Sequence, residues 1–196
     1  PKDSKGNQVY PGFLYDTGIA EGRGIPGVLR SPSPPGPPIQ SLEMDVDREA
    51  RAVDTDPQAI LTDTWSWTNL NTFSGRGGKL LFFHGVSDPW FSALDTVDYY
   101  ERVGRDNGGP GEVRNWSRLF LSPGMGHCSG GELALDSFDL LSAVVDWVEK
   151  GVAPDAVPAT GQSRPGRSRP LCPYPQHAHY KGRGDPEAAS SFECRE

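Results

Sequence analysis

The sequence predicts an α/β fold in which parallel strands are joined by crossover helices and flanked by long Pro/Gly-rich loops. Two short apolar runs, 79–83 and 118–121, are each followed by a segment with helical periodicity. Strands of a parallel sheet are apolar on both faces because helices cover both sides, and strands alternate with helices along such a chain. Glycine and proline contribute 24 and 19 of the 196 residues, so loops should fill much of the remainder.

The first strand and helix are expected in the middle of the chain. The run 79–83 has glycines before it and His84 and Gly85 after it, as a short buried strand would. Apolar residues then recur at helical spacing over 93–103 and end near Gly104. This spacing predicts a crossover helix that packs on the first strand.

The second strand and helix follow in the same order. The run 118–121 predicts a strand that stops at Pro123. Apolar residues over 138–148 predict an amphipathic helix, with Asp136 as its N-cap and Gly151 as its C-terminal stop. The strand, helix, strand, helix order favours a parallel pair of strands.

Composition divides the chain into three segments. Residues 1–70 are rich in loops, with a weak helical pattern over 45–52, and 71–151 hold the two strands and two helices. Residues 152–196 are rich in Pro, Gly and Arg, and we expect this extension to be ordered only through its two cysteines. A chain of 196 residues has room for one ordinary domain or for a piece of a larger one.

Charge and hydropathy exclude two classes of partner. The net charge of −7 has the wrong sign for a protein that binds the nucleic-acid backbone, so we expect no nucleic acid. No apolar run approaches the roughly 18 residues that a spanning helix needs, so we expect no membrane association. The opening residues, Pro1-Lys2-Asp3, do not resemble a signal peptide, and we expect the sequence to begin inside a longer protein.

Two polar side chains follow the two predicted strands, where ligands collect in open α/β sheets. Asp88 comes after the first strand and His127 after the second. They match the last two members of the Ser, Asp, His order of α/β-hydrolases, in which the carboxylate fixes the imidazole tautomer and the imidazole moves the serine proton. No Gly-x-Ser-x-Gly nucleophile motif occurs in the sequence. The alternatives are an Asx turn at Asp88, before Pro89, and a surface-loop histidine at 127.

Longer motifs around these residues resemble the C-terminal part of the tannase and feruloyl esterase family. Within that family they are most similar to the branch of bacterial mono(2-hydroxyethyl) terephthalate hydrolases. The similarity covers about residues 70–196 strongly and 1–30 loosely. The motifs are KLLFFHGVSDPWFS at 79–92, the tyrosine pair at 99–100, PGMGHCSGG at 123–131 and RPLCPYP at 169–175.

The resemblance implies that the chain is the C-terminal part of an α/β-hydrolase fold, with Asp88 as the acid and His127 as the base of a serine triad. It implies that Cys128 pairs with a cysteine beside the nucleophile, outside this sequence; the alternative is a free, buried thiol. It also implies a structural disulfide between Cys172 and Cys194. Disulfides indicate an oxidising compartment, so we expect the protein to be secreted or periplasmic.

The resemblance also assigns substrate contacts. His84 and Phe91 are expected near the acyl group, although His84 could simply cap the strand and Phe91 could simply pack. Tyr15 aligns with an aromatic residue that clamps the substrate ring, a position where the family branch has Trp. The family's calcium would sit in a lid that is missing here, so we expect no cofactor or metal in this chain.

The leading interpretation is the C-terminal fragment of a secreted serine carboxylic ester hydrolase that acts on feruloyl, galloyl or terephthalate monoesters. Such a fragment should be inactive without the N-terminal segment that carries the serine, which is its expected partner alongside a small aromatic ester. The alternative is a non-catalytic binding module or a degenerate hydrolase. A metal hydrolase built on His84, Asp88 and His127 is a third and weaker option, because its metal would need an open position for water.

Overall fold

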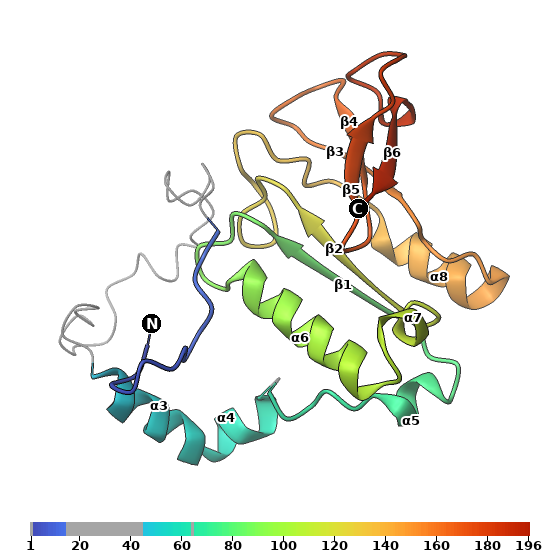
Figure 1. The fold of residues 1–196 in the computed structure, drawn as a ribbon. Coiled ribbons are helices and arrows are strands. Elements are labelled where there is room, and N and C mark those ends of the chain that lie inside the picture. The colour runs from blue at the N-terminus through green and yellow to red at the C-terminus, as the bar shows by residue number, and fades with distance from the viewer. Residues whose placement is uncertain (1, 15–44, 64) are drawn as a thin grey trace.

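The computed structural model describes residues 2–14, 45–63 and 65–196 (Figure 1). At its centre lie two parallel strands, β1 (Leu80–Gly85) and β2 (Ser117–Ser122), in register from Leu80 opposite Ser117 to Gly85 opposite Ser122. The predicted parallel pair is therefore confirmed. Helix α6 (Ala93–Asp106) and the short α7 (Pro110–Val113) form the crossover between the strands.

Helix α6 covers one face of the strands. It begins at Ser92, whose side chain accepts a hydrogen bond from the Leu94 N–H, and its C-cap is Asn107. Tyr99 and Tyr100 of α6 meet the Phe82 ring edge-on, with centroids 5.9 and 5.8 Å away. The helix predicted over 93–103 is thus confirmed, and it runs slightly beyond Gly104.

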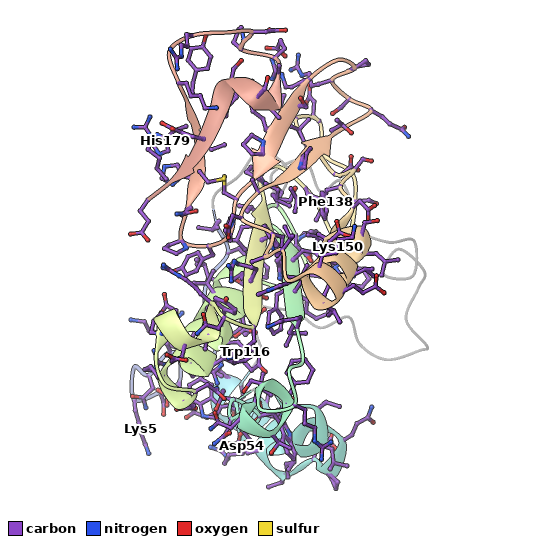
Figure 2. All side chains as sticks on the ribbon, turned by 90° about the vertical axis from the view of Figure 1, so that its right-hand side faces the viewer. Lys5, Asp54, Trp116, Phe138, Lys150 and His179 are labelled. Atoms are coloured by element: carbon purple, nitrogen blue, oxygen red, sulfur yellow. A yellow bond between two sulfur atoms is a disulfide. The ribbon has the colours of Figure 1, made fainter. Side chains whose placement is uncertain are left out.

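Helix α8 (Leu140–Lys150) covers the opposite face, since successive side chains of a strand point to opposite sides. Phe138, labelled in Figure 2, lies just before the helix. Its ring meets Phe83 of β1 edge-on, with the centroids 5.6 Å apart. Phe120 of β2 is fully buried in the core on this side. Phe138 and Leu140 pack against the buried Phe120, and this contact holds α8 against the strands, since full burial of a large apolar side chain contributes roughly 2 kcal/mol.

The predicted start of α8 was wrong, whereas its predicted end is confirmed. Asp139 is the N-cap, and its carboxylate accepts a hydrogen bond from the Ser142 N–H at 2.8 Å. Ser137 instead forms a β-bridge with Thr160, which keeps the preceding backbone extended and delays the helix. Asp136 accepts from the Gly130 N–H at 2.7 Å, and Gly151 ends the helix in the left-handed conformation with φ 71°.

Among the described residues before β1 lie the helices α3 (Val46–Thr55), α4 (Pro57–Thr62) and α5 (Asn71–Ser74). The weak helical pattern over 45–52 is confirmed by α3, which Asp45 caps through a hydrogen bond from the Arg48 N–H. Across the described ranges, every helix is too short or too polar to span a bilayer.

The C-terminal extension is more ordered than its composition predicts. It forms two antiparallel pairs, β3 (Val157–Thr160) with β4 (Ser168–Leu171) and β5 (His177–Tyr180) with β6 (Phe192–Arg195), and a single turn η1 (Ala189–Ser191) precedes β6. The predicted Cys172–Cys194 disulfide is present, with 5.5 Å between the two Cα atoms, and its sulfur atoms are yellow in Figure 2.

The expectation that the two cysteines are the only anchor of this extension was wrong. The Tyr174 N–H donates to the Leu119 carbonyl of β2 at 2.7 Å, and Pro173 forms a β-bridge with Phe120. Backbone pairing therefore fixes the extension to the outer edge of β2, independently of the disulfide. The division at residues 70 and 151 stays a prediction.

Candidate active site

The loops that leave β1 and β2 touch each other because residue 85 is glycine. A Cβ atom there would overlap with the carbonyl oxygens of Met125 and Gly126. Hydrogen bonds join the loops, from the Val86 N–H to Ser122 at 3.0 Å and from the Ser87 N–H to Met125 at 2.9 Å. The end of each strand therefore delivers its polar loop to one place, as expected for the carboxyl ends of parallel strands.

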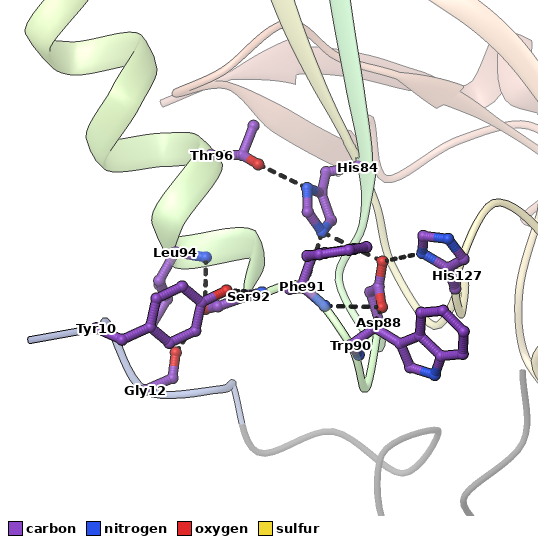
Figure 3. Close-up of polar contacts among 10 residues, drawn as sticks. All are labelled: Tyr10, Gly12, His84, Asp88, Trp90, Phe91, Ser92, Leu94, Thr96 and His127. Carbon is purple, nitrogen blue, oxygen red and sulfur yellow. Dashed lines mark hydrogen bonds and ion pairs between the residues drawn. The ribbon is translucent and has the colours of Figure 1, made fainter. Parts of the chain in front are cut away.

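Asp88 lies between the two loops and is buried, with 4% of its surface exposed. Its Oδ1 atom accepts hydrogen bonds from the N–H groups of Trp90 and Phe91, at 2.8 and 3.2 Å. Its Oδ2 atom is 2.8 Å from Nδ1 of His127 (Figure 3). One carboxylate oxygen thus makes the hydrogen bonds of the Asx turn that the sequence offered as an alternative. The other oxygen contacts the imidazole and orients it.

His127 is held by polar and aromatic contacts together. The carboxylate can only accept at neutral pH, so we assign the proton to Nδ1, which leaves Nε2 as the nitrogen able to take a proton from another group. The ring of Trp90 stacks on the imidazole with centroids 5.0 Å apart, and the ring of Phe91 lies 5.4 Å away. The imidazole is therefore confined on three sides and remains partly exposed.

His84 lies behind Asp88, with both of its ring nitrogens engaged. Nδ1 is 2.6 Å from the Thr96 hydroxyl, and Nε2 is 3.0 Å from the Phe91 carbonyl and 3.5 Å from Oδ2 of Asp88. A carbonyl requires a donor, so Nε2 carries the proton and Nδ1 accepts from the hydroxyl. This geometry favours a positioning role, and a direct contact with substrate stays a prediction.

The other site residues from the sequence are placed as follows. Phe91 is 54% exposed and projects beside the imidazole, where a ligand can reach it. Cys128 is a free, exposed thiol next to His127, with φ 63°. Its expected partner would lie outside this sequence, so its pairing stays a prediction. Tyr15 lies outside the described residues.

Sequence reasoning missed a tether from the N-terminal segment. The Ser92 N–H donates to the Tyr10 hydroxyl at 2.8 Å, and the Ser92 hydroxyl donates to the Gly12 carbonyl at 2.5 Å (Figure 3). Burial raises the pKa of Tyr10 above its usual value. No local pattern reveals this contact, because its partners are some 80 positions apart in the sequence. The stacking role of Trp90 was also missed, although the residue stands inside the quoted motif.

A cavity of about 550 Å³ lies beside the site, between the strand ends and the C-terminal pairs. Its apolar wall includes Val86, Leu121 and Leu171, and Arg169 contributes a charge. Neither Asp88 nor His127 lines it, so the hydrogen-bonded pair faces a different surface. In the described parts of the chain, no group of three or more His, Cys, Asp or Glu side chains gathers as a metal site would require.

Parallel strands with crossover helices and an Asp–His pair at their carboxyl ends define part of an α/β-hydrolase. The tannase and feruloyl esterase family matches residues 39–195, and the chain belongs to this family. It is a family of carboxylic ester hydrolases, as the sequence motifs indicated.

Curated relatives support the same family assignment. The chain is 51% identical over 133 residues to the mono(2-hydroxyethyl) terephthalate hydrolase of Piscinibacter sakaiensis. This alignment covers 65% of this chain and 21% of that protein. It is 40% identical over 131 residues to a probable feruloyl esterase of Arthroderma benhamiae, covering 64% of this chain and 24% of that protein. The chain therefore spans about a quarter or less of these relatives.

Solved structures agree with this assignment. A crystal structure of an esterase from Aspergillus oryzae superposes with a TM-score of 0.67 at 30% identity, over 82% of this chain and 35% of that one. Feruloyl esterase B from Aspergillus oryzae gives 0.61 at 29% identity, over 75% of this chain and 32% of that one. The predicted fold class, a partial α/β-hydrolase, is confirmed.

Proposed function

We propose that this chain supplies the acid and the base of a serine carboxylic ester hydrolase that acts on esters of aromatic acids. The observation that carries the proposal is the 2.8 Å hydrogen bond between Nδ1 of His127 and the buried carboxylate of Asp88. This bond fixes the tautomer in which Nε2 is unprotonated and able to act as a base.

In the proposed reaction the nucleophile is a serine of the enzyme part outside this chain. Nε2 of His127 takes the hydroxyl proton while the serine oxygen attacks the ester carbonyl. The tetrahedral intermediate collapses to an acyl-enzyme, and the imidazolium returns the proton to the departing alkoxide, which leaves as an alcohol. Water then repeats the cycle and releases the carboxylic acid. Asp88 stays ionised throughout and stabilises the imidazolium.

An aromatic acyl group fits the surroundings of the imidazole. The exposed ring of Phe91 lies 5.4 Å from His127, so a substrate whose carbonyl reaches the base would bring its ring alongside Phe91. Offset or edge contacts between such rings contribute about 1 kcal/mol beyond the area that they bury. Two relatives are named for terephthalate and feruloyl esters, which supports the same substrate class.

His84 contributes to this pocket indirectly in our proposal. Its Nε2–H donates to the Phe91 carbonyl, and its Nδ1 accepts from Thr96 of α6. The imidazole therefore ties the aromatic side of the pocket to a helix and keeps a donor near the carboxylate. The calcium expected for the family belongs to the lid outside this chain, and no step of the proposed reaction uses it.

The Cys172–Cys194 disulfide supports an oxidising location, either secreted or periplasmic. The 196-residue chain is proposed to be inactive alone, because a His–Asp pair without a nucleophile and its oxyanion donors lacks the groups that form the acyl-enzyme.

The test combines this chain with the missing part of a relative. The part of the Piscinibacter sakaiensis hydrolase that precedes the shared region is fused to the N-terminus of this chain. Hydrolysis of mono(2-hydroxyethyl) terephthalate, methyl ferulate and methyl gallate by the fusion protein is then measured. We expect turnover that His127→Ala lowers at least about 10³-fold. His177→Ala is the matched control, because this exposed histidine on β5 should leave turnover unchanged. Absence of turnover, or equal turnover in both variants, would contradict the proposal.

A further inference from the structure

The cavity of about 550 Å³ beside the Asp–His pair is lined from two parts of the chain. Val86 and Leu121 come from the ends of the parallel strands, and Leu171 and Ala178 come from β4 and β5 of the extension. Small-molecule sites in proteins usually have volumes of about 300–1,000 Å³ and mostly apolar walls. The cavity therefore has the size and the wall of a ligand site, and neither residue of the pair takes part in it.

The shape of the cavity is fixed before any ligand binds. Pro123, Pro170 and Pro175 line it, and the ring of each proline holds φ in one narrow range. The disulfide of Cys172, another lining residue, and the antiparallel pairing of β3 with β4 hold the extension in place. Because little of the protein has to be ordered on binding, an apolar ligand would retain more of its binding free energy.

The charges around the cavity have one sign. Arg167, Arg169 and His177 line it, whereas none of its described lining residues is Asp or Glu. The chain as a whole has the opposite balance, with 26 acidic and 19 basic side chains. A pocket lined by one sign of charge raises the local concentration of ions of the opposite sign. The cavity therefore favours an anion.

The two arginines differ in their partners. Arg167 binds Glu187 with two hydrogen bonds, from Nε at 2.5 Å and from Nη2 at 2.9 Å. Arg167 also lowers the pKa of Glu187 most, and Arg169 lowers it less. Among the described residues Arg169 has no carboxylate within ion-pair distance, and its Nη1 donates to the Ser168 carbonyl at 2.7 Å. Of the two arginines, Arg169 is thus the one whose charge is available to an anion.

The orientation of Arg169 suits a carboxylate. Its guanidinium lies over the ring of Phe192, 4.1 Å from the centroid, so one face is packed and the plane is fixed. The hydrogen bond to Ser168 uses Nη1, and no described residue accepts from Nε or Nη2. These two nitrogens form one edge of the guanidinium, and their parallel N–H groups match the two oxygens of a carboxylate. A carboxylate can therefore bind this edge with two hydrogen bonds.

We propose that this cavity binds a small carboxylic acid with an apolar body, whose carboxylate binds Arg169 and whose body lies on Leu121 and Leu171. One available guanidinium calls for one negative charge, and the aliphatic wall calls for an uncharged remainder. The body is an aromatic ring or an alkyl chain, which the first experiment distinguishes. Binding here does not depend on the proposed esterase function, because the cavity is a different surface and its test needs only the 196-residue chain.

The first experiment titrates ferulate and octanoate into the isotope-labelled chain and follows amide chemical shifts by NMR. We expect the amides of Leu171 and Ala178 to shift, with a Kd on the order of 1 mM or lower for the better acid. Methyl ferulate lacks the charge and acetate lacks the apolar body, so each should bind at least about tenfold more weakly. The comparison of ferulate with octanoate shows whether the body is aromatic or aliphatic.

The second experiment compares variants matched in charge. Arg169→Gln removes the guanidinium and should weaken binding at least about tenfold, whereas Arg169→Lys keeps the charge without the paired N–H groups and should bind with intermediate affinity. Arg164→Gln is the matched control, because it removes the same charge from an exposed position of the extension outside the cavity. It should change the Kd by less than about twofold, since an exposed distant charge is screened.

A further pair of variants leaves Arg169 and its stack on Phe192 intact. Leu133→Asp places a carboxylate on the half-exposed part of the cavity wall, where it repels an anion, and should weaken binding at least about tenfold. Val152→Asp adds the same charge at an exposed position outside the cavity and should change binding little. Circular dichroism checks that each variant is folded, and either Arg169→Gln or Leu133→Asp decides the question if the other fails to fold.

Each result decides the proposal. Tighter binding of an acid than of methyl ferulate, weakened by Arg169→Gln or Leu133→Asp and not by their controls, supports it. Several results overturn it: no binding by either acid, equal binding of ferulate and methyl ferulate, equal losses in Arg169→Gln and Arg164→Gln, or shifts confined to the loops of Asp88 and His127.

The titration is then repeated with the fusion protein. Unchanged affinity supports the site in the complete enzyme, and loss of binding overturns it there, because the added part would then fill the cavity. An inactive fusion protein that still binds the acid contradicts the proposed esterase function and supports the cavity site.

Discussion

The indole of Trp90 lies nearly parallel to the imidazole of His127, with their planes 15° apart and their centroids separated by 5.0 Å. The backbone N–H of Trp90 donates to Asp88, which in turn contacts the same imidazole. One short turn therefore holds the imidazole by its edge through the carboxylate and by its face through the indole. The Nε1 atom of Trp90 is buried and has no hydrogen-bond partner among the described residues, so the stack accounts for its placement better than a polar contact does.

We predict that Trp90 orients the imidazole. In the active fusion, Trp90→Leu should lower kcat about tenfold with little change in KM, because a stack of this kind contributes about 1 kcal/mol and its loss lets the base rotate away from the reacting serine. Trp90→Phe, which keeps an aromatic face, should recover most of the rate. Steady-state kinetics measure the split, and equal losses in the two variants would reduce Trp90 to a packing residue.

A second prediction concerns the glycine at the end of β1. Gly85→Ala should lower the free energy of unfolding by about 2–3 kcal/mol, because the new methyl group meets backbone carbonyls of the His127 loop that cannot rotate away. Gly111→Ala in α7 is the control, since a Cβ there meets nothing within 4 Å and should be neutral or slightly stabilising. Urea unfolding monitored by circular dichroism gives both values. A neutral Gly85→Ala variant would show that the two loops are not in contact.

The third prediction separates the disulfide from the site. Cys172 and Cys194 are 22 residues apart, a loop length for which cross-linking stabilises a fold by about 3 kcal/mol in the chain-entropy account. The double variant Cys172→Ser/Cys194→Ser should lose about that much stability in denaturant unfolding. Cys128→Ser should lose almost none, because this thiol is exposed and unpaired in the isolated chain. A large loss in Cys128→Ser would mean that this thiol is packed or bonded in solution.

The fourth prediction is a pH dependence at Tyr174, whose hydroxyl donates to Glu101 of α6 at 2.7 Å. This hydrogen bond raises the pKa of Tyr174 to about 12. Because the folded state holds the proton more tightly, the stabilisation is fully present below the unfolded pKa of about 10 and is lost as the pH rises toward 12.

The variant Tyr174→Phe tests whether this stabilisation falls as the pH rises. Wild type should be more stable than the variant by about 1 kcal/mol or less at pH 8, since the bond is solvent-accessible, and the difference should vanish by pH 12. Tyr180→Phe, which changes an exposed tyrosine of the same extension whose hydroxyl donates to the Gly184 carbonyl and not to a carboxylate, controls for general alkaline effects. A difference that grows with pH would contradict the assignment.

The central strands and helices could be predicted because their signals are local. Leu80 to Phe83 form an unbroken apolar run, and the spacing over α6 leaves one clear face for burial. The proximity of Asp88 and His127 followed from topology, since loops at the carboxyl ends of neighbouring parallel strands must meet. Their hydrogen bond and the stack of Trp90 depend on rotamers, which the sequence pattern does not specify.

The two antiparallel strand pairs of the C-terminal extension could not be predicted, because their sequences carry no clear local signal for strands. Pro158 and Pro170 stand opposite each other in β3 and β4, although proline is usually read as a strand breaker. In a pair of only two strands each strand has a free edge, so a position that faces outward needs no N–H and tolerates proline. The tether between Tyr10 and Ser92 was equally hidden, because it joins distant segments without any periodic signal.

The two oxygens of Asp88 have separate duties, and this division has a functional consequence. An amide in place of the carboxylate would still accept from the Trp90 backbone and preserve the turn, but its NH₂ would face Nδ1 and drive the imidazole proton to the far nitrogen. The pocket would survive unchanged while its base became a donor. Under the proposed function, the single substitution Asp88→Asn would therefore remove the base while leaving the turn that carries it in place.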